Sequence, residues 1–101
     1  MRPIKITGSS RSCQVPPGDV QALVTRLRLL GDSQDPLPNA ETASGYLEGL
    51  LGGSPTWRTT ELHEPTARAM VHVLDLMLAE GSISPPLYCV RSVLRSDFGF
   101  D

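Results

Sequence analysis

Hydrophobic residues are most concentrated between Pro65 and Glu80, in the sequence PTARAMVHVLDLMLAE. On a helix that turns about 100° per residue, the polar side chains of this segment form one narrow stripe, consisting of Arg68, His72 and Asp75. Nearly all the remaining circumference is apolar. A helix with so little polar surface needs neighbours on most of its sides, so we expect it to be the central helix of the fold.

Three further segments have apolar residues at helical spacing, which predicts helices near residues 18–30, 40–51 and 86–96 in addition to 65–80. In the first of them, Leu29 points away from the apolar face. Together with Ala22 it is a candidate for a second contact surface. The second helix contains Gly45 and Gly49, each of which costs up to about 1 kcal/mol relative to Ala, so packing must supply most of its stability.

The N-terminal segment has the alternation of a short strand, with apolar Ile4 and Ile6 between polar neighbours. Cys13 and Val15 follow a Gly/Ser-rich turn and suggest a second strand that pairs back on the first. Residues 56–64 have no periodicity and are interpreted as a loop, with Trp57 as a lid over the helices. The pattern therefore predicts a mainly α fold: a compact bundle of about four helices in one domain (1–101), with a strand or hairpin arm (1–16) and a helical core (17–98).

Composition narrows the classes of partner. The chain has 101 residues and a formal net charge of −2, and eight of its nine basic residues are Arg. This charge gives no general electrostatic reason to expect binding to nucleic acid or acidic membranes. No signal-peptide h-region follows Met1, and the apolar runs are much shorter than the ~20 residues of a membrane span. We therefore expect a soluble, cytoplasmic protein that does not interact with membranes.

The two cysteines, Cys13 and Cys89, fit no metal-binding pattern. The helical pattern around Cys89 favours a small buried or half-buried side chain that serves packing. The sequence leaves open whether Cys13 and Cys89 form a disulfide.

The polar stripe of the central helix is the most enzyme-like feature. Asp75 follows His72 by three positions and could orient its imidazole, but no Ser or Cys nucleophile neighbours the pair in sequence. His63 and Glu64, added to this pair, match none of the zinc patterns. A solvated helix edge explains these residues better, so we predict no enzymatic activity, no cofactor and no metal.

The segment 74–95 has a loose helix-turn-helix pattern around Gly81. In a DNA-binding regulator its second helix would present a polar face to the groove, formed by Ser84, Tyr88, Arg91, Ser92 and Arg95. Against this, only two basic residues lie on that helix, two prolines begin it, and the chain is negatively charged. DNA binding is therefore the alternative hypothesis, and nucleic acid is the less favoured partner.

Residues 77–94, MLAEGSISPPLYCVRSVL, resemble the short Gly-x-Ile-Ser helical pairs of many bacterial interaction domains. The resemblance covers about a fifth of the chain and identifies no family. It implies a packed helical hairpin in a protein that binds other proteins.

Taken together, the sequence favours a small non-enzymatic interaction module, an adaptor or inhibitor that docks on a larger protein assembly. Chains of this size and Arg-rich composition are often bacterial accessory or phage-borne proteins, including inhibitors of host defence. The sequence leaves open whether the protein forms a homodimer, because the apolar face of a helix at an interface and one in the core have the same sequence pattern. The candidate partner-binding residues are apolar, aromatic or basic: Leu29, Trp57, Tyr88, Arg91, Arg95, Phe98 and Phe100.

Overall fold

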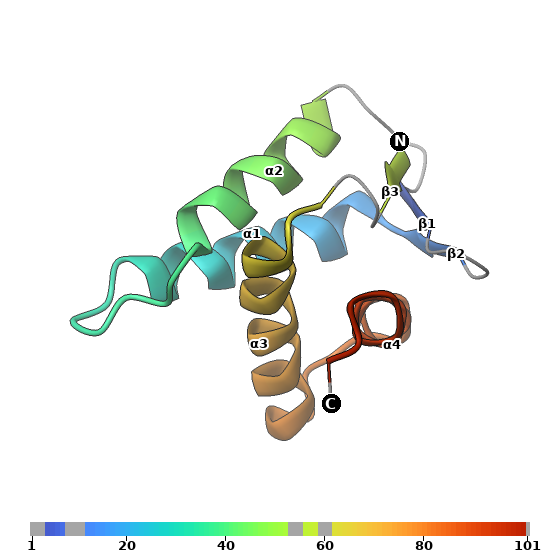
Figure 1. Ribbon diagram of the computed structural model, residues 1–101. Helices are drawn as coiled ribbons and strands as arrows, with labels where there is room; N and C mark the ends of the chain where they lie inside the picture. The colour runs from blue at the N-terminus through green and yellow to red at the C-terminus, as the bar shows by residue number, and fades with distance from the viewer. Residues whose placement is uncertain (1–3, 8–11, 53–55, 59–61, 101) are drawn as a thin grey trace.

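The computed structural model describes residues 4–7, 12–52, 56–58 and 62–100. It is mainly helical, as the sequence predicts (Figure 1). No boundary of the four helices differs from its predicted position by more than two residues. The helices are α1 (Pro17–Gly31), α2 (Ala40–Gly52), α3 (Glu64–Glu80) and α4 (Pro85–Phe98).

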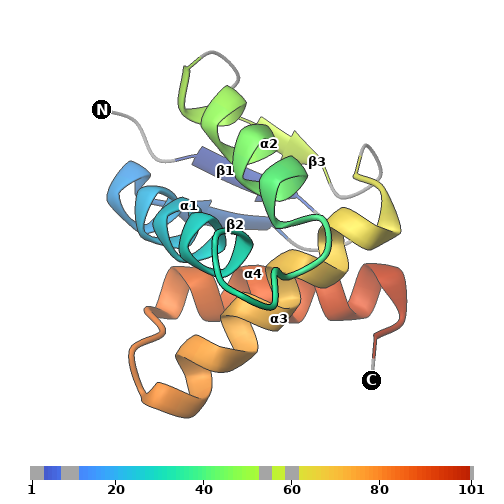
Figure 2. The ribbon, with the colours of Figure 1, turned by 90° about the vertical axis from the view of Figure 1, so that its left-hand side faces the viewer.

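The helices form two pairs that share one core. The helices α1 and α2 pack side by side, and α3 contacts both of them as well as α4. Figure 1 shows α4 end-on beside α3, and Figure 2 shows the same helix lengthwise, crossing α3. Buried apolar side chains of all four helices form a single cluster, which also includes Cys13 and Val15. The predicted central position of α3 is therefore confirmed.

A three-stranded sheet lies at one end of the helices, in the order β2-β1-β3. Strand β1 (Ile4–Thr7) pairs antiparallel with β2 (Ser12–Val15), which is the predicted hairpin. Strand β3 (Thr56–Arg58) pairs parallel with the other edge of β1. The interpretation of 56–64 as a loop throughout is therefore wrong. A three-residue strand is too short to show alternation, and its partner is far away in the sequence. The side chain of Trp57 lies outside the described residues, so its role as a lid stays a prediction.

The covering of α3 is less complete than its sequence suggests. Met70 and Leu74 are fully buried, but Leu76 and Leu78 are 38% and 39% exposed. The C-terminal end of α3 extends beyond α1 and α2 in both ribbon views (Figures 1 and 2). Neighbours therefore cover most of this helix, as the sequence predicts, but they leave Leu76 and Leu78 in its last turns partly exposed. A wheel projection compares directions around the axis and carries no information about where the neighbouring helices end.

The ends of α3 and α4 follow from local chemistry. Gly81 ends α3 in the left-handed conformation, with φ of 73°. The Ser84 hydroxyl caps α4 by accepting a hydrogen bond from the backbone N–H of Leu87. Gly99 ends α4 with φ of 68°, and the next backbone N–H, that of Phe100, donates to the carbonyl oxygen of Arg95 at 3.0 Å. The chain therefore turns back toward α4 at Phe100.

A disulfide between Cys13 and Cys89 joins the sheet to α4. The two Cα atoms are 6.0 Å apart, and the residues are separated by 76 positions. The side chain of Cys13 is buried, whereas that of Cys89 is half-buried. The prediction of a buried or half-buried Cys89 is confirmed, and the pairing that the sequence left open is present. The bond fixes strand β2 covalently on the helices. Among the described helices, none has the length and apolarity needed to cross a bilayer.

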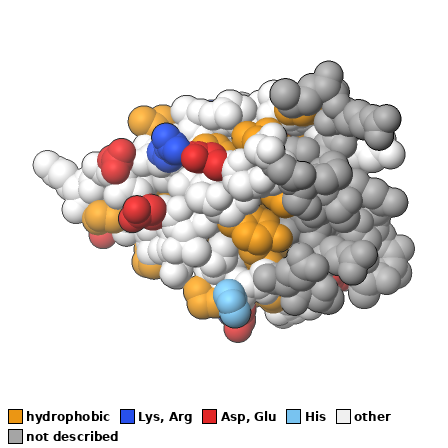
Figure 3. All heavy atoms as spheres, turned by 90° about the horizontal axis from the view of Figure 1, so that it is seen from above, with side chains coloured by type: hydrophobic (Ala, Val, Ile, Leu, Met, Phe, Trp, Pro, Cys, Tyr) orange, Lys and Arg blue, Asp and Glu red, His pale blue; other side chains and the backbone are white. Residues whose placement is uncertain are grey.

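Two glycines on the exposed face of α2 lower its stability. A Cβ added at Gly45 or Gly49 meets open space, and neither residue has a positive φ. Among the described residues, the surface seen from the α2 side is mostly backbone and uncharged polar atoms (Figure 3). We expect Gly45→Ala and Gly49→Ala each to raise the free energy of unfolding by about 0.5–1 kcal/mol in urea titrations. Gly81→Ala is the matched control and should lower it, because an alanine there must adopt a positive φ. A loss of stability in both α2 variants would contradict this account.

Candidate functional site

The structure separates the sequence-predicted candidates into exposed and internally used side chains. Leu29 is 68% exposed and Tyr88 is 48% exposed. Phe98 and Phe100 are half-buried against the core and stack on each other, with ring centroids 5.6 Å apart. These two rings contribute to the fold itself, so the exposed leucine and tyrosine remain the better apolar contact candidates.

Leu29 lies on an apolar groove between α1 and α3, which we call the α1–α3 groove. Its volume is about 620 Å³. The lining residues are Ala22, Thr25, Arg26, Leu29, Leu30, Val73, Leu76 and Glu80. The second contact surface that the sequence predicts for Ala22 and Leu29 is thus one wall of this groove. Sequence reasoning missed Leu76, because it placed this side chain in the covered part of α3.

One wall of the groove is formed by residues on the same side of α1. Ala22, Thr25 and Leu29 follow each other at i, i+3 and i+7, so they lie on one side of the helix. Leu76 lines the groove from α3. Near one end, Arg26 and Glu80 form an ion pair at 2.6 Å that connects the two helices. Both partners are substantially exposed, so this pair contributes little to stability and is free to rearrange around a ligand.

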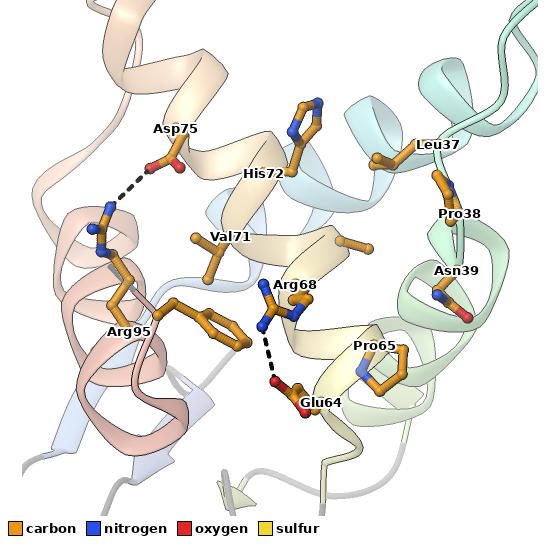
Figure 4. Close-up of a pocket in the computed structure, with 12 residues that line it drawn as sticks. Leu37, Pro38, Asn39, Glu64, Pro65, Arg68, Val71, His72, Asp75 and Arg95 are labelled. Carbon is orange, nitrogen blue, oxygen red and sulfur yellow. Dashed lines mark hydrogen bonds and ion pairs between the residues drawn. The ribbon is translucent and has the colours of Figure 1, made fainter.

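A second depression lies over the polar stripe of the central helix, and we call it the α3 hollow (Figure 4). Its volume is about 640 Å³. The connection between α1 and α2 supplies one wall, and the end of α4 supplies the other. The lining residues are Leu37, Pro38, Asn39, Glu64, Pro65, Arg68, Ala69, Val71, His72, Asp75, Arg95 and Phe100. None of them lines the α1–α3 groove.

Charged side chains in the α3 hollow are held by specific contacts. The Arg91 Nε donates a hydrogen bond to Asp75 Oδ1, and Arg95 Nη1 lies 3.9 Å from the same oxygen. On the other side of the hollow, Arg68 donates to Glu64 at 3.0 Å. Its guanidinium also lies 4.5 Å from the centroid of the Phe100 ring, a cation–π contact.

His72 and Asp75 do not form a catalytic pair in the structure. The two side chains point to different sides of α3 (Figure 4), and the Asp75 carboxylate is engaged by arginines instead of the imidazole. The described lining of the hollow contains no Ser, Thr or Cys that could act as a nucleophile. Within the described residues, no three His, Cys, Asp or Glu side chains gather at a spacing suited to a metal ion.

The helix pair α3–α4 also bears on the DNA-binding hypothesis. The side chain of Arg91 is only 17% exposed and is bonded to Asp75, and its guanidinium lies 5.9 Å from the Tyr88 ring. Arg95 faces the same carboxylate. Arg91, one of the two arginines that a DNA reader would need, is therefore engaged within the protein, which weakens the DNA-binding hypothesis.

Comparison of the chain with protein families, with curated proteins and with solved structures finds no match to any of them.

Proposed function

We propose that this protein is a non-enzymatic interaction module, an adaptor or inhibitor that docks on a larger protein through the α1–α3 groove. The observation that supports this proposal is the exposure of Leu29 and Leu76 on one concave, largely apolar surface. A leucine that is 68% exposed contributes little to the folded core. Grouped apolar side chains at the surface are typical of protein contact sites.

The shape of the groove favours a helix of the partner as the bound element. Two helices form its walls, and an amphipathic helix fills such a groove with apolar residues at i, i+3, i+4 and i+7. Arg26 and Glu80 place one positive and one negative charge at its rim. A partner helix with complementary charges at that end would therefore bind in one preferred direction.

We expect Leu29→Asp to weaken partner binding about thirtyfold or more, because it places a charge in the apolar contact. The fold should change little, since the side chain is mostly exposed. Thr42→Asp is the matched control: it adds the same charge at an exposed position on α2, outside the groove. Affinities of the three proteins for the captured partner, measured by calorimetry, check this expectation.

The partner itself is to be identified by crosslinking in the natural host. A photoreactive residue is placed at position 29 or 76, and at position 42 as the control, and samples are purified with and without nuclease. The proposal expects one protein that crosslinks from the two groove positions alone and survives nuclease. Loss of every partner with nuclease would contradict it and favour nucleic acid. Crosslinks only between copies of this chain would replace it by a homodimer.

A further inference from the structure

Two arginines share the Asp75 carboxylate at the α3 hollow: Arg95, which lines the hollow, and Arg91, which lies outside its lining. Asp75 accepts a hydrogen bond from Arg91, and Arg95 approaches the same oxygen only to 3.9 Å. No hydrogen bond of Arg95 to another described side chain accompanies this contact. With Arg91 included from outside the lining, three arginines contact two carboxylates, because Arg68 pairs with Glu64 and the other two share Asp75. This local positive excess lies in a chain whose net charge is −2.

An aromatic ring is fixed beside these arginines. Gly99 turns the chain back after α4, and the Phe100 N–H bonds to the Arg95 carbonyl oxygen. The Phe100 ring then lies 4.5 Å from the Arg68 guanidinium. Pro65 and Leu37 add apolar surface to the same lining. The hollow therefore combines guanidinium donors with an apolar wall.

We propose that the α3 hollow binds a carboxylate-bearing ligand, whose acid group contacts Arg95 and Arg68 and whose apolar body packs against Phe100. The planar guanidinium matches a carboxylate with two parallel hydrogen bonds, which a neutral amide cannot reproduce. The volume of about 640 Å³ lies within the usual range of small-ligand sites. The carboxylate belongs either to a small organic acid or to the C-terminus of a peptide, which present the same chemistry.

The proposal concerns a site that shares no lining residue with the α1–α3 groove. Leu29→Asp should therefore leave carboxylate binding unchanged. Failure of either proposal would leave the other standing.

The test is a titration of the isotope-labelled protein followed by NMR. The probes are phenylacetate, N-acetyl-Gly-Gly-Phe with a free C-terminal carboxylate, and the amide of each. We expect saturable shifts of the Arg95 and Arg68 Nε–H signals with the acids, and binding weaker by about tenfold or more with the amides. Tighter binding of phenylacetate would indicate a free organic acid, whereas tighter binding of the peptide would indicate a C-terminus.

Substitutions connect the signal to the arginines. Arg95→Gln should weaken binding of the acids about tenfold or more, and Arg95→Lys should weaken it less, because it retains the charge and loses the planar fork. Arg28→Gln is the matched control, since that arginine pairs with Glu48 outside the hollow. The backbone spectrum of each variant verifies its fold. Equal binding of acids and amides, absence of saturable shifts at millimolar acid, or unchanged binding in folded Arg95→Gln would overturn the proposal.

Discussion

Reduction of the Cys13–Cys89 disulfide is expected to lower the free energy of unfolding by about 4 kcal/mol. The bond joins residues that are 76 positions apart, so opening it restores a large conformational freedom to the unfolded chain. Domains of this size are stable by about 5–15 kcal/mol, so the loss is a substantial fraction of the total. Urea titrations with and without a dithiol reductant measure it.

The double variant Cys13→Ser, Cys89→Ser provides the control for this measurement. Its unfolding midpoint should match that of the reduced protein and should not respond to the reductant. An oxidised protein that unfolds at the same urea concentration as the reduced one would contradict the expectation. Hydrogen exchange should locate the change: three strands of three or four residues form a sheet that is marginal by itself, so the amides of β1, β2 and β3 should lose most protection.

The predicted cytoplasmic location bears on whether the Cys13–Cys89 disulfide forms in the cell. Disulfides persist in oxidising compartments and are rare in a reducing cytosol. A cytoplasmic protein would therefore work mainly in the dithiol form, with the lower stability. Alkylation of thiols in freshly lysed host cells, followed by mass spectrometry of the peptides with Cys13 and Cys89, determines which form is present.

The helical part of the fold could be predicted from the sequence because its signals are local. Apolar spacing places each helix, and residues such as Ser84 and Gly81 place the ends. Strand β3 and the disulfide depend on segments far apart in the sequence: Thr56–Arg58 pairs with β1, and Cys89 bonds to Cys13. Their own neighbours in the sequence carry no signal for either contact. A single sequence, read without the structure, therefore predicts neither strand β3 nor the disulfide.

In the candidate sites, too, features set by one helix could be predicted, whereas features set by the packing of two helices could not. The outward direction of Leu29 follows from its position on α1, so the sequence could single it out. The opposite wall at Leu76 depends on where α1 ends relative to α3, which is a tertiary property. Likewise, Arg91 and Arg95 are visible in the sequence as a basic face of one helix. Their contact with Asp75 appears only when α3 and α4 pack together, and it changes what those arginines are available to bind.

A comparison of two leucines on α3 tests the central role of this helix. Leu74→Ala should lower the free energy of unfolding by about 3 kcal/mol, because the side chain is fully buried in the hydrophobic core and its removal leaves a cavity there. Leu76→Ala, two positions later on the same helix, should cost only about 1 kcal/mol, since that side chain is 38% exposed in the α1–α3 groove. Chemical denaturation of both variants under the same conditions measures the difference.

The two variants distinguish an effect on stability from an effect on binding, because each replaces a leucine of α3 by alanine. If the groove holds a partner helix, Leu76→Ala should weaken partner affinity while keeping most of the stability. Leu74→Ala should have the opposite effect: the folded fraction falls, and the affinity of the molecules that remain folded stays close to that of the original protein. Equal stability losses in the two variants would mean that the end of α3 is covered as completely as its middle. The groove would then no longer be available for a partner.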